Sequence, residues 1–299
     1  MDVLIPVQQL TKVIILMIGA ILLALLDSFN LNQLKKSLDD LLDKIEIDKD
    51  LELAAVIQQN LIPGNIRLPG IKIHSYLESA RSIGGDYFDI FKMKNGHIGF
   101  FIADVSGHGV SSALIATALK VVLQQAPNEM KKHPVELLHY LDIYFKENFI
   151  HHHMTAQYLY VNPEEKKIYL ANAGHPFPIY IAPNQEPDFW ISYGSLIGYG
   201  FFEIDTVLYS RSYEINDRII FYTDGLLETM DFQGNLYGYQ NFLDSIKESK
   251  KFSTEKLKHT IVNKSKSFHS LDTVEDDLAL VILEFTHDSE FHKPSGDIS

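Results

Sequence analysis

The sequence predicts an α+β fold, a layered antiparallel β-sandwich flanked by helices and preceded by an N-terminal helical segment. Beyond Pro69, short runs rich in Ile, Val, Tyr and Phe alternate with turn residues, which is typical of β-strands. A hairpin turn at Pro163–Lys166 joins two of these runs, and helical stretches are grouped between the others. This arrangement favours a layered α+β domain over a doubly wound parallel sheet.

The first predicted element, residues 1–30, is a hydrophobic segment. Val13–Leu26 is an uninterrupted apolar run, which Leu10–Phe29 extends at both ends. A membrane-spanning helix needs roughly 20 apolar residues. Because no small-residue cleavage site follows, the run favours a membrane helix over a signal peptide, with an interfacial or packed helix as the alternative. Lys35 and Lys36 then favour a cytoplasmic location for the rest of the chain.

Residues 31–50 are predicted to form an amphipathic linker helix. Apolar side chains recur at alternating spacings of three and four residues, at Leu31, Leu34, Leu38, Leu41 and Ile45. Such spacing is the a/d seam of a short coiled coil, through which two copies of the chain would form a homodimer. A single amphipathic helix packed on its own domain fits the pattern equally well. A further helical stretch, Leu51–Leu61, ends at Pro63-Gly64.

The remaining elements are assigned from hydrophobic periodicity and turn residues. The predicted strands are Ile71–Tyr76, Ile98–Val105, Gln157–Val161, Lys167–Ala171, Val207–Tyr213, Arg218–Tyr222 and Leu278–Phe285. The predicted helices are Ser111–Gln125, Val135–Phe149, Gln240–Ser249 and Thr254–Phe268. The tail, residues 286–299, is polar and is expected to be disordered.

The composition excludes several classes of function. The chain has 26 basic and 39 acidic residues, a formal net charge of −13, which argues against nucleic-acid binding as the main task because that needs a basic surface. It contains no cysteine, so disulfides, thiolate zinc sites and cysteine nucleophiles are excluded. Hydrolysis of a phosphate ester by this chain could not pass through a phosphocysteine.

Four acidic clusters lie within or beside the hydrophobic runs. They are Gly84-Gly85-Asp86, Asp104-Val105-Ser106-Gly107-His108-Gly109, Tyr222-Thr223-Asp224-Gly225 and Glu275-Asp276-Asp277. Asp104 comes at the end of the apolar run Ile98–Ala103 and Asp224 follows the strand Arg218–Tyr222, whereas Asp276 and Asp277 precede a strand. Because the end of one antiparallel strand lies beside the start of its neighbour, these three sets are expected to meet at one edge of a sheet.

Gathered carboxylates indicate a site for hard divalent cations. Carboxylate oxygens suit Mg²⁺ or Mn²⁺ better than Zn²⁺. Two such ions can share a bridging carboxylate and lower the pKa of a water molecule held between them. The sequence therefore favours hydrolysis of phosphoesters.

The ordered motifs carry a family resemblance. They are Ile83–Asp89, Asp104–Val110, Asn172–Pro176, Tyr222–Gly225 and Asp276-Asp277. Together they resemble the bacterial metal-dependent serine/threonine protein phosphatases of the protein phosphatase 2C fold, in particular the stage II sporulation E and stress-response regulator branch. The resemblance covers a predicted phosphatase domain at residues 51–285.

The resemblance implies a role for each acidic cluster. It implies that Asp104 bridges two Mn²⁺ or Mg²⁺ ions and that the carbonyl of Val105 completes the shell of one ion. Asp224 and Asp276 would bind as well, with Asp86 contributing directly or through water. Of the paired acids, Asp276 is preferred to Asp277 as a ligand. The catalytic residues would be Asp104 and Asp224.

The resemblance also implies a reaction and a partner. Family members hydrolyse phosphoserine or phosphothreonine by direct attack of the metal-bridging water, without a phosphoenzyme. Known substrates in this branch are phosphorylated anti-sigma-factor antagonists. With the hydrophobic segment, this implies a phosphatase tethered to the bacterial inner membrane, its catalytic domain in the cytoplasm; a cytoplasmic protein is the alternative. A catalytically inactive scaffold or sensor with the same fold is the alternative function.

Some features depart from the family pattern or favour a structural role over a catalytic one. Ser106 stands where eukaryotic relatives carry a histidine, and Ser195–Gly198 lacks the proline usual in that loop. His108 and His175 are expected to have structural roles in turns, and His151–His153 to form a solvated helix end. A nucleotide cyclase is disfavoured because Tyr87 replaces the Glu of its Gly-Gly-Asp/Glu-Glu-Phe hairpin.

Overall fold

The computed structural model describes residues 7–63, 68–93, 96–200, 203–268 and 276–287, and the predicted disorder of the tail falls mostly outside them. Its contacts divide the chain into two compact units, Met1–Leu53 and Ala54–Ser299. The prediction that the phosphatase domain begins at residue 51 remains a prediction.

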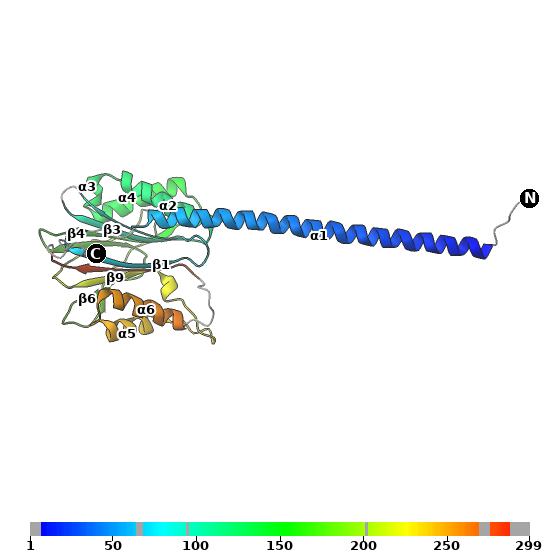
Figure 1. Cartoon of the computed structure of the whole chain (residues 1–299). Helices are drawn as coiled ribbons and strands as arrows, with labels where there is room; N and C mark the ends of the chain where they lie inside the picture. Colours follow the sequence, from blue (N-terminus) through cyan, green and yellow to red (C-terminus); the bar gives the residue numbers. More distant parts are fainter. Residues whose placement is uncertain (1–6, 64–67, 94–95, 201–202, 269–275, 288–299) are drawn as a thin grey trace, which may run out of the picture. The chain divides into compact units, whose positions relative to one another are not determined.

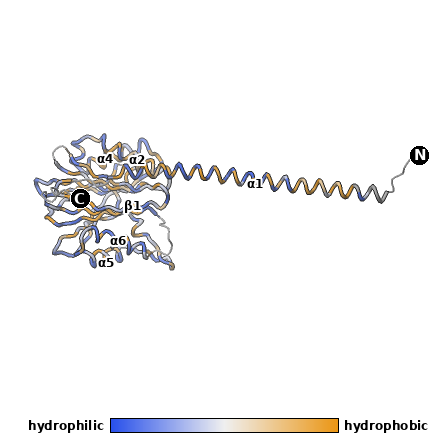
Figure 2. Tube along the Cα trace, viewed as in Figure 1, coloured by the Kyte–Doolittle hydropathy of each residue, from blue (hydrophilic) through white to orange (hydrophobic). Residues whose placement is uncertain are grey.

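The N-terminal unit is part of one long helix. Helix α1, Val7–Leu61, is continuous over 55 residues, or about 80 Å at 1.5 Å per residue. The sequence suggested separate stretches on either side of residue 50, but no proline interrupts this range, so the backbone hydrogen bonds run through. Figure 2 shows apolar residues dominating the N-terminal half of α1. The leucines of the predicted seam, such as Leu34 and Leu38, are exposed in this single chain.

The C-terminal unit is built on two antiparallel five-stranded sheets. One sheet has the order β1 (Ile71–Glu78), β10 (Leu278–Phe285), β9 (Arg218–Tyr222), β6 (Ile179–Ile181) and β7 (Asp188–Phe189). The other has the order β2 (Asp86–Lys92), β3 (Ile98–Val105), β4 (Met154–Asn162), β5 (Lys167–Ala173) and β8 (Tyr209–Ser212). We call them the β10 sheet and the β3 sheet. The predicted antiparallel β-sandwich is confirmed.

Helices cover the two outer faces of this sandwich. Helices α2 (Val110–Gln125), α3 (Asn128–Lys131) and α4 (Pro134–Asn148) lie on one side, and α5 (Gly238–Ser249) and α6 (Thr254–Phe268) on the other (Figure 1). A single 3₁₀ turn, η1 (Asp224–Leu226), follows β9. The result is a four-layered arrangement of helices, sheet, sheet and helices.

Three apolar cores hold the layers together, and β3 shows how one strand serves two of them. Phe101 packs in the core beneath α2 and α4, whereas Phe100 packs in the core between the sheets. Successive side chains on a strand point to opposite faces, so a strand buried on both sides must be apolar throughout. The rings of Phe100 and Phe221 lie 4.5 Å apart across the two sheets. The third core joins the β10 sheet to α5 and α6.

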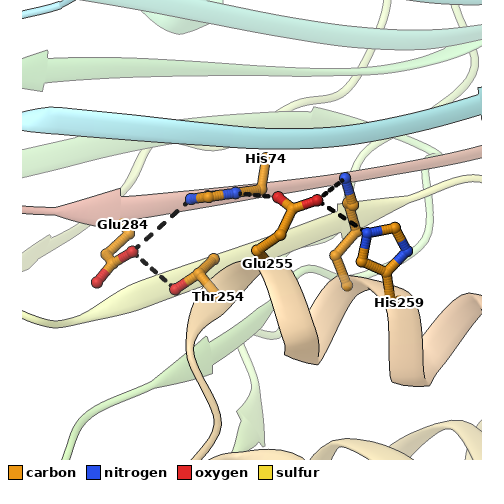
Figure 3. Close-up of polar contacts among 6 residues, drawn as sticks. His74, Thr254, Glu255, His259 and Glu284 are labelled. Atoms are coloured by element: carbon orange, nitrogen blue, oxygen red, sulfur yellow. Dashed lines mark hydrogen bonds and ion pairs between the residues drawn. The ribbon is translucent and has the colours of Figure 1, made fainter. Parts of the chain in front are cut away.

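A polar cluster fastens the start of α6 to the β10 sheet (Figure 3). The carboxylate of Glu255 accepts a hydrogen bond from Nδ1 of His74 on β1 at 2.7 Å. Two residues one turn later on α6, Lys258 and His259, also donate to this carboxylate, at 2.8 and 2.9 Å. The hydroxyl of Thr254 donates to Glu284 on β10 at 2.7 Å. The cluster therefore links α6 to two neighbouring strands.

Candidate active site

The first two acids of the site come from the β3 sheet. Asp86 is the first residue of β2, and its direct partner in the antiparallel pairing is Asp104, near the end of β3. Oδ2 of Asp86 accepts a 2.6 Å hydrogen bond from the hydroxyl of Thr223, which follows β9 in the other sheet. Thr223 also accepts a hydrogen bond from the backbone of Ala279 at 2.8 Å. One threonine thus ties Asp86 to the β10 sheet.

The remaining acids come from the β10 sheet. Asp224 begins the 3₁₀ turn after β9, and Asp276 and Asp277 directly precede β10. Strands β9 and β10 are antiparallel neighbours, with Tyr222 opposite Leu280, so the end of β9 lies beside the start of β10. The pairing explains why these three acids meet.

The expectation that Asp104 would share a single sheet edge with the other two sets is wrong. Asp104 and Asp86 belong to the β3 sheet, whereas Asp224, Asp276 and Asp277 flank strands of the β10 sheet. The acids gather at the facing edges of two stacked sheets. Alternation along each strand does not reveal which strands pair, because pairing is set by contacts between distant parts of the chain.

Burial and mutual repulsion make these carboxylates costly to ionise. Burial, reinforced by the charges of Asp224 and Asp276, raises the pKa of Asp104 to about 7. Burial and the charge of Asp104 also raise the pKa of Asp86 well above its usual range. The pKa of Asp224 is raised by burial and by Asp276, and that of Glu228 by burial and by Asp224. A bound cation would offset this repulsion.

The donor chemistry fits a hard divalent cation, although the side chains are not drawn together around one. The acids supply only oxygen donors, which Mg²⁺ and Mn²⁺ prefer. Within the ranges that the structure describes, no three His, Asp or Glu side chains stand close enough to hold a metal ion as they are. A cation would therefore have to draw the carboxylates inward.

Two glycines let the backbone segments of the site approach closely. A Cβ on Gly85 would lie 2.7 Å from the carbonyl oxygen of Val105, and one on Gly84 would lie 2.6 Å from Cγ of Asp277. Both distances are shorter than real Cβ contacts. At Gly85 the obstacle is backbone, so glycine is required there, whereas a side chain at Gly84 would displace the carboxylate of Asp277. The carbonyl of Val105, a predicted ligand, therefore borders the backbone that leads to Asp86.

Asp277 holds the loop that leads to Asp86. Its two carboxylate oxygens accept hydrogen bonds from the backbone N–H groups of Ala80 at 2.9 Å and Gly85 at 2.6 Å. Asp276 is exposed and accepts a bond from the N–H of Asp277 at 2.8 Å. This division supports the preference for Asp276 as a metal ligand, which stays a prediction.

Sequence reasoning gave no role to four residues around the site. Gln58, near the end of α1, donates to the carbonyl of Gly84 at 2.7 Å and accepts from its N–H at 3.2 Å. The guanidinium of exposed Arg81 lies near the glycine turn, 3.8 Å from where a Cβ on Gly109 would be. The other two are Thr223 and Glu228. Three of these residues could have been found from their positions in the sequence. Thr223 and Glu228 lie close to Asp224, and Arg81 lies shortly before Asp86.

His175 and His108 lie in turns, as expected, whereas His152 and His153 are half-buried beyond the end of α4, so the predicted solvated helix end at His151–His153 is wrong. His175 is buried, and burial lowers the pKa of its imidazole to about 3, so the ring is neutral. The side chain of Asn172 closes the turn before it, accepting from the N–H of His175 at 2.8 Å and donating to its carbonyl at 2.9 Å. His108 is exposed between two glycines with positive φ. His152 follows the end of α4, and its Nδ1 lies 3.2 Å from the carbonyl of Ser106.

Two stacked antiparallel sheets, outer helix layers and acids gathered where the sheets face each other define a protein of the protein phosphatase 2C fold. The stage II sporulation protein E family matches residues 94–286, and the chain belongs to this family. It is a family of metal-dependent protein serine phosphatases.

Individual relatives agree with this assignment. The phosphoserine phosphatase RsbP of Bacillus subtilis (strain 168) is 29% identical over 190 residues, which cover 62% of this chain and 47% of RsbP. The chain thus spans less than half the length of RsbP. The PP2C domain of SiaA from Pseudomonas aeruginosa has a TM-score of 0.72 at 18% identity, over 81% of this chain and 98% of that domain. RsbX, solved in complex with magnesium, has a TM-score of 0.54 at 17% identity, over 74% and 98%.

Proposed function

We propose that this chain is a phosphoprotein phosphatase that uses two Mn²⁺ or Mg²⁺ ions to hydrolyse phosphoserine or phosphothreonine in a partner protein. The observation that carries the proposal is the gathering of carboxylates from four chain segments, with Asp86 buried, Asp104 and Asp224 half-buried, and the pKa values of all three raised. A protein keeps such repulsion only where a cation or a function offsets it. The relative RsbP is named a phosphoserine phosphatase, and this supports phosphoserine as the substrate of this chain.

Each acid has a proposed part. Asp104 would bridge the two ions, Asp224 and Asp276 would bind from the β10 sheet, and Asp86 would bind directly or through water. The carbonyl of Val105 would complete one shell. When bound, the ions would supply the positive charge that activates water and stabilises the phosphoryl group in the transition state.

The protein itself would position these ligands and the phosphate. Thr223 orients Asp86 through its 2.6 Å hydrogen bond, and Asp277 fixes the loop before Asp86. Arg81 lies beside the glycine turn that follows Asp104, and its side chain has no hydrogen bond or ion pair in the described part of the chain. Its guanidinium would pair with the phosphate oxygens, whose geometry suits a planar fork of donors.

The proposed partner and location follow from the family and from α1. We propose a phosphorylated anti-sigma-factor antagonist as the substrate. Among the described residues, one helix is long and apolar enough to cross a membrane, the part of α1 that begins at Ile14. We propose that this helix is an inner-membrane anchor and that the phosphatase domain lies in the cytoplasm.

The experiment is a metal-dependence assay on the full-length chain in detergent. We expect p-nitrophenyl phosphate and a phosphoserine peptide to be hydrolysed with Mn²⁺ or Mg²⁺ and not after chelation. Asp104→Asn is expected to lose activity by on the order of 100-fold or more, because it removes the bridging charge. Turnover without metal, or full activity in the variant, would contradict the mechanism. A folded chain that shows no turnover with either metal would favour the inactive scaffold.

A further inference from the structure

A hydrogen-bonded hairpin follows the 3₁₀ turn that begins at the proposed metal ligand Asp224, and it carries an exposed aromatic ring at its tip. We call residues 227–238 the Phe232 hairpin. Its stem is closed by backbone hydrogen bonds from Gly238 to Leu227 at 2.9 Å and from Tyr237 to Thr229 at 2.8 Å. The next pair inward, Met230 and Leu236, forms an antiparallel bridge. The segment is therefore an ordered structure and has a defined tip.

The tip is held by one aspartate. The carboxylate of Asp231 accepts hydrogen bonds from the backbone N–H groups of Gln233 at 2.8 Å and Asn235 at 2.9 Å, and from the side-chain amide of Asn235 at 2.9 Å. The turn is completed by Gly234, whose φ of +79° suits glycine. Phe232 lies inside this turn, so its position is fixed by a network that does not include its own ring.

The root of the hairpin is anchored in the domain core. Leu226 and Leu227 are buried in the core that joins the β10 sheet to α5 and α6. The hydroxyl of Ser265 on α6 donates to the carbonyl of Leu226 at 3.0 Å, and that of Thr229 lies 3.1 Å from the Ser265 hydroxyl. The hairpin is thus fixed to the same elements that carry Asp224.

The hairpin exposes several apolar side chains, alongside the polar side chains of Gln233 and Asn235. The side chain of Phe232 is 88% exposed, and Leu236 is 51% exposed. Met230 is partly exposed, and so is Tyr239, directly after the hairpin. A large apolar group held rigidly in solvent is the feature that marks interaction surfaces, because aromatic anchors supply much of the binding energy at such surfaces.

This surface adjoins the carboxylates of the site. At the root of the hairpin, the N–H groups of Leu227 and Glu228 donate to the carbonyl of Asp224 at 2.7 and 2.9 Å. Tyr239 lies directly after the hairpin, and the charges of Asp224 and Glu228 add to burial in raising the pKa of its hydroxyl. The ring also packs edge-on against Phe189 of β7, with centroids 5.7 Å apart. A protein segment that enters the site past Tyr239 would therefore pass the apolar face of the hairpin.

Charge indicates which contacts can hold a substrate here. The chain carries a net charge of −13, and the site itself is lined by acids, so a phosphoprotein gains little from long-range attraction. Affinity beyond the metal-bound phosphate must then come mainly from apolar contacts. The hairpin offers such contacts at the border of the site.

We propose that the Phe232 hairpin binds an apolar segment flanking the phosphorylated residue of the substrate protein, and that Phe232 determines specificity for it. The inference rests on the proposed phosphatase function and names the kind of substrate that the site selects. The partner is a phosphoprotein whose phosphoserine is bordered by leucine-like side chains.

The test uses two synthetic phosphoserine peptides that differ only in the residues flanking the phosphoserine, which are leucines in one and serines in the other. The full-length protein with Mn²⁺ is expected to hydrolyse the leucine peptide with a kcat/KM about tenfold higher, mainly through KM. Phe232→Ser should abolish this preference and Phe232→Leu should restore part of it. Hydrolysis of p-nitrophenyl phosphate should be unchanged in both variants.

The controls separate this inference from the proposed function. Ile143→Ser removes another exposed apolar side chain, 56% exposed, from α4 on the other side of the sandwich, and should keep the full preference. Equal rates for the two peptides in the wild-type protein, or a preference that survives Phe232→Ser, would overturn the inference. In either case continued metal-dependent hydrolysis of p-nitrophenyl phosphate would leave the phosphatase function intact, whereas its absence would refute that function itself.

Discussion

At the scale of single residues, the carboxylates of the site destabilise the fold that assembles them. Asp104 faces Asp86 in the strand pairing and is affected by the charges of Asp224 and Asp276. Like charges gathered in a buried place raise one another's pKa, and this cost is relieved by a cation. Metal binding and stability should therefore be coupled in this protein.

Asp104→Asn should separate the effect of charge repulsion on stability from the effect of metal binding on stability. Removing the charge is expected to raise the metal-free stability by on the order of 1–3 kcal/mol, because the remaining acids lose their repulsive neighbour. The same change should abolish most of the stabilisation that Mn²⁺ gives the wild-type protein. Thermal unfolding of both proteins with a chelator and with Mn²⁺ measures this. A variant that is less stable than the wild type without metal would contradict the repulsion.

The pH dependence follows from the raised pKa of Asp104. Its folded-state pKa of about 7 lies above the ordinary value of 3.8, so the folded state holds this proton more tightly than the unfolded state. Without metal, this carboxyl therefore costs stability as the pH rises from about 4 to about 7. The difference in unfolding temperature between Asp104→Asn and the wild type should grow over that range and shrink when Mn²⁺ is present. A difference that is constant with pH would reject the assignment.

At the scale of elements, continuous apolar runs were predictable and interrupted ones were not. The bounds of β3, β9 and β10 match the prediction, because each contains at least four consecutive apolar or aromatic residues. Strand β2 was missed because Asp89 divides its apolar residues into two short pairs. Burial of Asp89 is possible only because Lys120 of α2 pairs with it at 2.8 Å, and local sequence does not show this contact.

The polar cluster at the start of α6 gives a second pH prediction. Hydrogen bonds from Lys258 and then His74 lower the pKa of Glu255 to about 2, below its ordinary value of 4.5. The stabilisation is complete above about pH 4.5 and is lost as the pH falls toward 2. Because Glu255 is largely exposed, Glu255→Gln should cost only about 0.5 kcal/mol at neutral pH.

Chemical denaturation of the wild type and Glu255→Gln at several pH values measures this contribution. The difference should vanish at the acid end of the window. High salt should reduce it at neutral pH, since an exposed cluster is screened. A difference that persists unchanged in salt and at low pH would indicate lost packing in place of lost charge.

At the scale of the whole molecule, the acids could be identified from sequence but their assembly could not. The motifs that contain Asp86, Asp104, Asp224 and Asp276 are local, so their residue types and order are visible in the chain. Their meeting depends on β2 and β3 pairing in one sheet while β9 and β10 pair in another. Side-chain hydrogen bonds such as those of Gln58 with Gly84 and Thr223 with Asp86 join segments more than 20 residues apart, so local sequence patterns do not predict them.

The last prediction concerns the leucine seam of α1. Leu31, Leu34 and Leu38 are exposed in the single chain, yet they repeat with coiled-coil spacing on a continuous helix. We expect the full-length protein in detergent to be a dimer by analytical ultracentrifugation. Leu38→Asp places a charge in the seam and should shift the protein to monomers, whereas Ser37→Asp, on an exposed position outside the seam, should leave the dimer intact. A monomeric wild type, or a dimer that survives Leu38→Asp, would show that the seam does not pair two chains.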